Sequence, residues 1–107
     1  MNAPIDDSFH HELHRVVDRL RSMPVSQLER PWHGYASRAE GVRALAQWCV
    51  ECTLLPASVG QPSVPNVGPL AVGDQLSVTC MDLYRAPRSP DVLAEAERRL
   101  RELRITL

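Results

Sequence analysis

The strongest structural signal in this chain comes from residues 37–56, SRAEGVRALAQWCVECTLLP. Ser37 followed by Glu40 is a capping box, which predicts that a helix begins here, and Pro56 predicts that it ends by residue 55. Apolar side chains surround the helix axis except along one polar stripe of Arg43, Gln47 and Glu51. A helix that is apolar on nearly every side needs cover on nearly every side, so we expect this one at the centre of the domain.

Two other segments have the three-four spacing of an amphipathic helix. The first is predicted to run from about Ser8 to Met23, because Ser8 or the two residues before it can cap it and Pro24 prevents its continuation. Its apolar seam is Phe9, Leu13, Val16, Leu20 and Met23. The second is predicted to begin at Ser89 as N-cap, with Pro90 in the first turn. Its seam is Leu93, Ala96, Leu100, Leu103 and Leu107.

Residues 74–86 allow two interpretations. Apolar and polar residues alternate from Leu76 to Cys80, which is typical of a strand, but Leu76, Cys80 and Leu83 also have helical spacing. Asp74 could cap such a helix and Pro87 could end it. A lone strand in a helical chain would leave its backbone groups without partners, so we favour the helix.

The stretch between these helices, residues 56–73, contains four prolines and three glycines. That composition excludes a long helix and a central strand. Its recurring apolar residues predict an extended path across the helices, with docking into a partner's groove as the alternative. The chain is therefore predicted to be a single all-α domain over residues 1–107. We expect a small four-helix domain with a central buried helix, a short connector at 24–36 and a long Pro-rich loop.

Composition excludes several classes of function. The formal charge is −1, which gives no field that would gather nucleic acid, and all twelve cationic residues are Arg. No apolar run is long enough to span a bilayer, so we expect no membrane association. Three cysteines without a secretory signal argue against a disulfide framework and favour a cytoplasmic protein.

Two clusters have side chains dense enough for chemistry: His10 with His14, and Cys49 with Cys52. Each pair shares a helix face and could bind a metal, the cysteines with help from a distant Cys80 or His33. Thiol oxidoreductases place their first cysteine at a helix N-terminus, whereas these thiols would lie in mid-helix. We therefore interpret the cysteines as core residues and the histidines as residues at the border of the core, and expect no metal and no cofactor.

A partner surface is predicted on the connector, where Trp32, His33 and Tyr35 concentrate aromatic side chains. The seam of the last helix, including Leu93 and Leu100, could pack on a second copy of the chain.

No catalytic set and no phosphate-binding loop can be singled out, although a site assembled from scattered residues would leave no such motif. The predicted function is thus a small cytoplasmic interaction or regulatory module without catalysis, which binds a protein partner or itself. The alternative is a metal- or redox-linked protein that uses Cys49, Cys52 and Cys80, or His10 and His14.

Two strings, RLRSMP at residues 19–24 and GDQLSVT at 73–79, with the later Asp82-Leu83, resemble short uncharacterised helical proteins of GC-rich actinobacteria. The resemblance covers about a fifth of the chain. It implies a helix over residues 74–86 and carries no activity with it.

Overall fold

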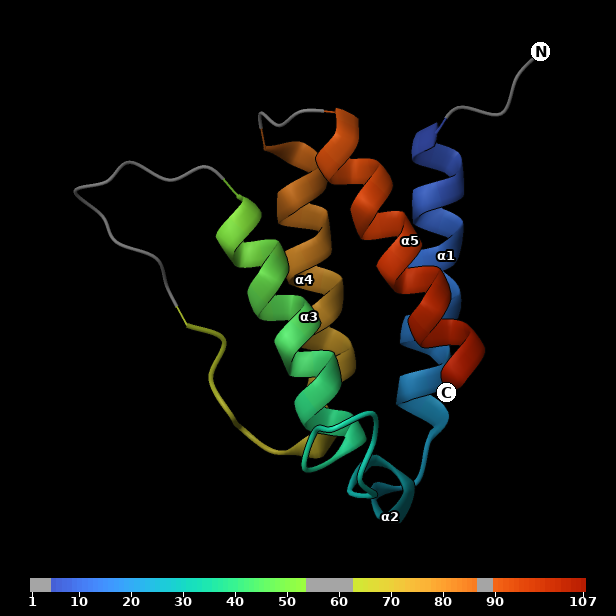
Figure 1. The fold of residues 1–107 in the computed structure, drawn as a ribbon, viewed down its shortest axis with the longest axis vertical. Coiled ribbons are helices and arrows are strands. Elements are labelled where there is room, and N and C mark those ends of the chain that lie inside the picture. Colours follow the sequence, from blue (N-terminus) through green and yellow to red (C-terminus); the bar gives the residue numbers. More distant parts are fainter. Residues whose placement is uncertain (1–4, 54–62, 87–89) are drawn as a thin grey trace.

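The computed structural model describes residues 5–53, 63–86 and 90–107, and the secondary structure in these ranges is helical. The helices are α1 (Ile5–Ser22), α2 (Val25–Leu28), α3 (Arg38–Cys52), α4 (Val72–Arg85) and α5 (Pro90–Thr106), with a 3₁₀ turn, η1 (Pro69–Ala71), before α4 (Figure 1). No strand occurs in the described ranges, which confirms the all-α prediction with four long helices. None of the described helices has both the length and the apolar character needed to cross a bilayer.

The long helices form two layers. In Figure 1, α3 and α5 lie in front of α4 and α1. α3 packs on α4, α4 packs on α1, and α1 packs on α5, whereas α3 and α5 have few contacts with each other. Three neighbouring pairs of long helices are therefore closely packed, whereas the fourth pair, α3 and α5, is loosely packed.

The core contains the two predicted seams except Leu107, which lies after α5 and is half-buried. On α1 and just after it, Phe9, Leu13, Val16, Leu20 and Met23 are all buried, and on α5 the same holds for Leu93, Ala96, Leu100 and Leu103. Leu76, Cys80 and Leu83 of α4, which packs on α1 and α3, are fully buried in the same core. Burial of such side chains on one face of each helix is the main driving force for this packing.

α3 is not the most central helix. α4 packs along both α3 and α1, and α1 packs along both α4 and α5, whereas α3 packs extensively on α4 alone. α3 buries the face that includes Val42, Ala46 and Cys49, but Leu45 and Trp48 on its next face are only half-buried. The helix predicted to run from Ser37 to Leu55 is confirmed as a helix buried on its face toward α4, but it ends at Cys52, and its predicted central position is wrong.

Several predicted helix ends are shifted. α1 begins at Ile5, so Ser8 lies inside the helix, where its hydroxyl donates a hydrogen bond to the Glu97 carboxylate at 2.9 Å. α4 begins two residues before Asp74, which does not cap it and instead accepts two hydrogen bonds from Arg21. The structure confirms the helical alternative for residues 74–86 and the first-turn position of Pro90. Ser89, Leu54 and Leu55 lie outside the described residues.

The second half of the Pro-rich segment runs across α3, as predicted. Val64 is buried, and its backbone N–H donates to the side-chain oxygen of Gln47 at 2.8 Å. Arg43 donates to the backbone oxygen of Val64 at 3.3 Å. The polar stripe of α3 therefore satisfies the backbone of this segment, whereas Val67 and Leu70 are exposed. Residues 54–62 lie outside the described ranges.

A charged clamp joins α1 to α5. The Glu12 carboxylate is buried and accepts hydrogen bonds from Arg104 at 2.6 and 3.2 Å and from Arg101 at 3.4 Å. The hydrogen bond from Arg104 lowers the pKa of Glu12 below its ordinary value, and burial opposes that shift only in part. This clamp and the hydrogen bond between Ser8 and Glu97 hold the two helices in register.

Candidate functional site

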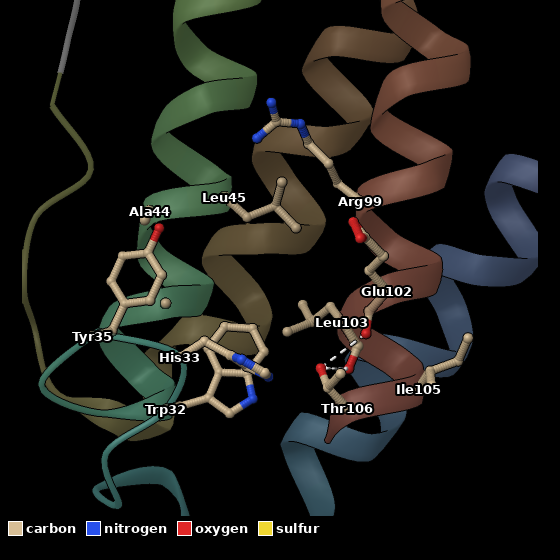
Figure 2. Close-up of a pocket in the computed structure, with 11 residues that line it drawn as sticks. Trp32, His33, Tyr35, Ala44, Leu45, Arg99, Glu102, Leu103, Ile105 and Thr106 are labelled. Atoms are coloured by element: carbon tan, nitrogen blue, oxygen red, sulfur yellow. Dashed lines mark hydrogen bonds between the residues drawn. The ribbon is translucent and has the colours of Figure 1, made fainter.

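A groove lies between α3 and α5, where the described helices have few contacts. It encloses a cavity of about 410 Å³, closed at one end by the turn at residues 32–35 (Figure 2). The lining residues are Trp32, His33, Tyr35, Gly41, Ala44, Leu45, Arg99, Glu102, Leu103, Ile105 and Thr106. They come from three places far apart in the sequence, so the groove is a product of the fold.

The α3 wall of the groove consists of Gly41, Ala44 and Leu45. Trp48 and Cys52 continue the stripe of Gly41 and Leu45 along the same helix face, at spacings of three and four residues, beyond the residues that line the cavity. Leu45, Trp48 and Cys52 are half-buried against the core. The α5 wall places Arg99 over the Trp48 ring, with the guanidinium carbon 4.3 Å from the ring centroid. Figure 2 shows Arg99 extending from α5 toward α3. This cation–π contact is a bridge between the two walls.

The turn at residues 32–35 is tight and strained. The backbone groups of Trp32 and Tyr35 exchange two hydrogen bonds, at 2.8 and 3.2 Å. The two residues between them, His33 and Gly34, have φ angles of 47° and 84°. Glycine adopts positive φ at no steric cost, but histidine does not, so this turn stores strain at His33. Strain of this kind persists only where surrounding contacts enforce it, and it is concentrated at functional sites.

Aromatic packing holds this turn on the first turns of α3. The rings of Trp32 and Tyr35 stack with their centroids 6.2 Å apart, and His33 packs edge-on to Trp32 at 4.7 Å. Trp32 lies so close to Gly41 that a Cβ there would be 2.4 Å from the ring atom Cε3. Gly41 lowers the helix propensity of this segment, but a residue with a Cβ there would displace the Trp32 ring from α3. Among the described residues, the buried indole N–H of Trp32 has no hydrogen-bond partner.

Charges of both signs line the α5 side of the groove. Arg99 donates to Glu95 at 2.8 Å, and Glu102 accepts from Arg98 at the same distance. The hydrogen bonds from Arg98 lower the pKa of Glu95 to about 2, so this carboxylate stays ionised at neutral pH. The groove thus combines an apolar wall on α3 with a wall on α5 that carries both a cation and an anion.

The structure brings together three of the predicted partner-binding residues and separates the other two. Trp32, His33 and Tyr35 line one end of the groove. Leu93 and Leu100 are 6% and 0% exposed, respectively, and contribute to the core of their own chain, so they are unsuited to contact a partner. Periodicity could not make this distinction, because a seam looks the same whether it packs within a chain or between chains.

The other eight lining residues were not predicted as part of a site, among them Leu45, Arg99, Glu102 and Ile105. The stripe on α3 was visible in the sequence as helical spacing, but it was interpreted as core. Nothing in the sequence pairs that stripe with α5, because the two walls are about fifty residues apart along the chain.

The cysteines form a second cluster beside the groove. Cys49 and Cys80 are buried, with their Sγ atoms 3.6 Å apart across the interface of α3 and α4. The contact with Cys49, together with burial, raises the pKa of Cys80 well above its ordinary value. Burial likewise raises the pKa of the half-buried Cys52. Cys49 and Cys80 thus match their prediction as core residues, and Cys52 lies at the border of the core.

The histidines of α1 lie apart from both clusters. His10 packs edge-on to the Tyr84 ring with their centroids 4.6 Å apart, and His14 contacts the Asp18 carboxylate at 3.1 Å. His11 is exposed. Within the part of the chain that the structure describes, no three His, Cys, Asp or Glu side chains are grouped in a way that could hold a metal ion.

No protein-family model, curated protein or solved structure matches this chain, so the groove is interpreted from its own geometry.

Proposed function

We propose that this protein is a small interaction module that acts by self-association, with the groove between α3 and α5 as its docking surface. The observation that carries this proposal is the stripe of Leu45, Trp48 and Cys52, which the described helices leave half-buried next to a strained aromatic turn. Apolar surface gathered in a groove with a polar edge is typical of a protein-binding site.

The chemistry of the groove favours a second copy as the occupant. Arg99 and Glu102 lie three residues apart on α5 and both line the groove. A two-fold axis between two copies can therefore place the cation of each beside the anion of the other. The formal charge of −1 adds little repulsion between copies.

The aromatic turn supports the same proposal. Tryptophan and tyrosine are enriched where interfaces gain most of their binding energy, because each buries a large rigid surface. Trp32 and Tyr35 are presented together, and the conformation that presents them is strained at His33. A turn without a binding role would gain stability from glycine or asparagine at that position.

Two matched substitutions test the proposal. Ile105 is 68% exposed and lines the groove, whereas Val78 is 60% exposed and lies outside it on α4. Light scattering over a concentration series should show the unmodified protein approaching the mass of a dimer. Ile105→Glu should weaken the dimer by about tenfold or more, because it buries a charge in the interface, and Val78→Glu should leave it unchanged.

The opposite outcomes are equally clear. A monomeric mass at every concentration up to about 1 mM would contradict self-association, since contacts weaker than that correspond to only about 4 kcal/mol. Equal weakening by both substitutions would show that the copies meet through another surface.

A further inference from the structure

The buried thiols of Cys49 and Cys80 lie close enough together to allow a bond between them. One lies on α3 and the other on α4, the two helices with the most extensive packing, and their Sγ atoms are 3.6 Å apart. Thirty residues separate them along the chain, including the Pro-rich segment. A disulfide needs Sγ atoms about 2 Å apart, so only a small movement of the two helices would be needed to form one.

We propose that Cys49 and Cys80 are an oxidisable pair that forms a disulfide between α3 and α4 when the protein meets a low-molecular-weight disulfide. Overall, the two thiols lose two electrons and two protons and form one S–S bond. The small disulfide gains them and is released as two thiols. The Cys49–Cys80 bond does not require the proposed self-association, because both thiols are buried in the α3/α4 interface. Cys52, its route of access, belongs to the stripe that a second copy would cover.

Cys52 provides a route by which a small disulfide in solvent can oxidise the buried pair. It lies one helical turn after Cys49 and is half-buried, so its sulfur is partly exposed to a small disulfide in solvent. Because burial raises the pKa of Cys52, only a small fraction of this thiol is ionised. That thiolate attacks the reagent, forms a mixed disulfide and releases the first small thiol. Cys49 then attacks the Cys52 sulfur and releases the second. Finally Cys80 attacks the Cys49 sulfur, and Cys52 leaves as a free thiol.

The disulfide would fasten α3 to the centre of the bundle. α3 has extensive contacts with α4 and few with α5, so its position depends on the α3/α4 interface. Closing a loop of this length restricts the unfolded chain, which should raise the melting temperature by about 10 °C.

The test treats the intact native protein with oxidised glutathione and maps its cysteines without reduction. Cleavage after Glu51 and Asp74 places Cys49, Cys52 and Cys80 on three different peptides, so each possible pairing gives a distinct product. We expect the peptides of Cys49 and Cys80 to be joined, with the loss of two hydrogen atoms and a higher melting temperature. Cys52→Ser should give the same product at least tenfold more slowly.

The map of the unmodified protein does not depend on whether any variant folds. A stable mixed disulfide on Cys52, a final Cys49–Cys52 bond, or three thiols that stay reduced in the native protein would overturn the proposed pair. Equal rates with and without Cys52 would contradict its role as the route of access.

Discussion

α5 packs extensively on α1 and has few contacts with α3, and these two sides of the helix differ in kind. Toward α1 it presents a seam of buried side chains, and its charged groups there are paired with Glu12 and Ser8. Toward α3 it borders a cavity of about 410 Å³, beside half-buried Leu45 and Trp48. The first contact accounts for stability, and the second is available for binding. A bundle of this size can therefore separate the two tasks on opposite sides of one helix.

The largest expected contrast is between two leucines. Leu100 is fully buried in the core, whereas Leu45 is half-buried in the groove. Leu100→Ala should lower the free energy of unfolding by about 3 kcal/mol, since it removes a buried side chain and leaves a cavity. Leu45→Ala should lower it by about 1 kcal/mol, because solvent already reaches that site. Urea denaturation measures both changes in unfolding free energy. Equal losses would show that the α1 side and the α3 side of α5 contribute alike to stability.

Breaking the charged clamp should have an intermediate effect. Glu12→Gln leaves Arg104 and Arg101 without their carboxylate and should cost about 2 kcal/mol at pH 7. The pKa of Glu12 is lowered in the folded protein, so its contribution is complete above the unfolded value of 4.5 and is lost as the pH falls through the folded value.

Denaturation at a series of pH values checks the sign of this effect. The difference in unfolding free energy between Glu12→Gln and the unmodified protein should shrink in acid. A difference that stays constant down to pH values well below 4.5 would show that the carboxylate charge plays no part.

The smallest expected effects come from two helix glycines and should have opposite signs. Gly41→Ala should destabilise the protein by about 1 kcal/mol, because the new Cβ would lie 2.4 Å from the Trp32 ring. At Gly73→Ala the nearest atom to the new Cβ would be the Leu20 Cβ at 3.4 Å, an ordinary van der Waals contact, so the higher helix propensity of alanine should stabilise the protein by about 0.5 kcal/mol. Thermal denaturation gives the two signs, and tryptophan fluorescence reports the displaced ring. A stabilising Gly41→Ala would mean that Trp32 is not seated on α3.

The sequence was sufficient for the helices but insufficient for their arrangement. Heptad spacing located the seams of α1 and α5, and the cost of an unpaired strand identified α4 as a helix. The apolar circumference of α3 suggested a central helix, but part of it lines the groove instead. An apolar pattern indicates that a helix face is buried. It does not indicate whether the same chain or a second copy buries that face.

Contacts between distant residues could not be predicted. The carboxylate of Glu12 meets Arg104, 92 positions later, and no local signal links them. The same holds at Gly41, where the missing side chain leaves room for a close approach. The approaching group is the Trp32 ring, which no local pattern identifies.

The proposed docking surface is tested most directly by amide hydrogen exchange at two protein concentrations, one below and one above the onset of association. If two copies meet through the groove, protection at the higher concentration should rise along residues 41–52 and 99–106 of α3 and α5. Protection in the middle of α4 should stay the same at both concentrations. Increased protection confined to the outer faces of α1 and α4, or no change anywhere at a concentration where dimers are present, would contradict the proposed docking surface.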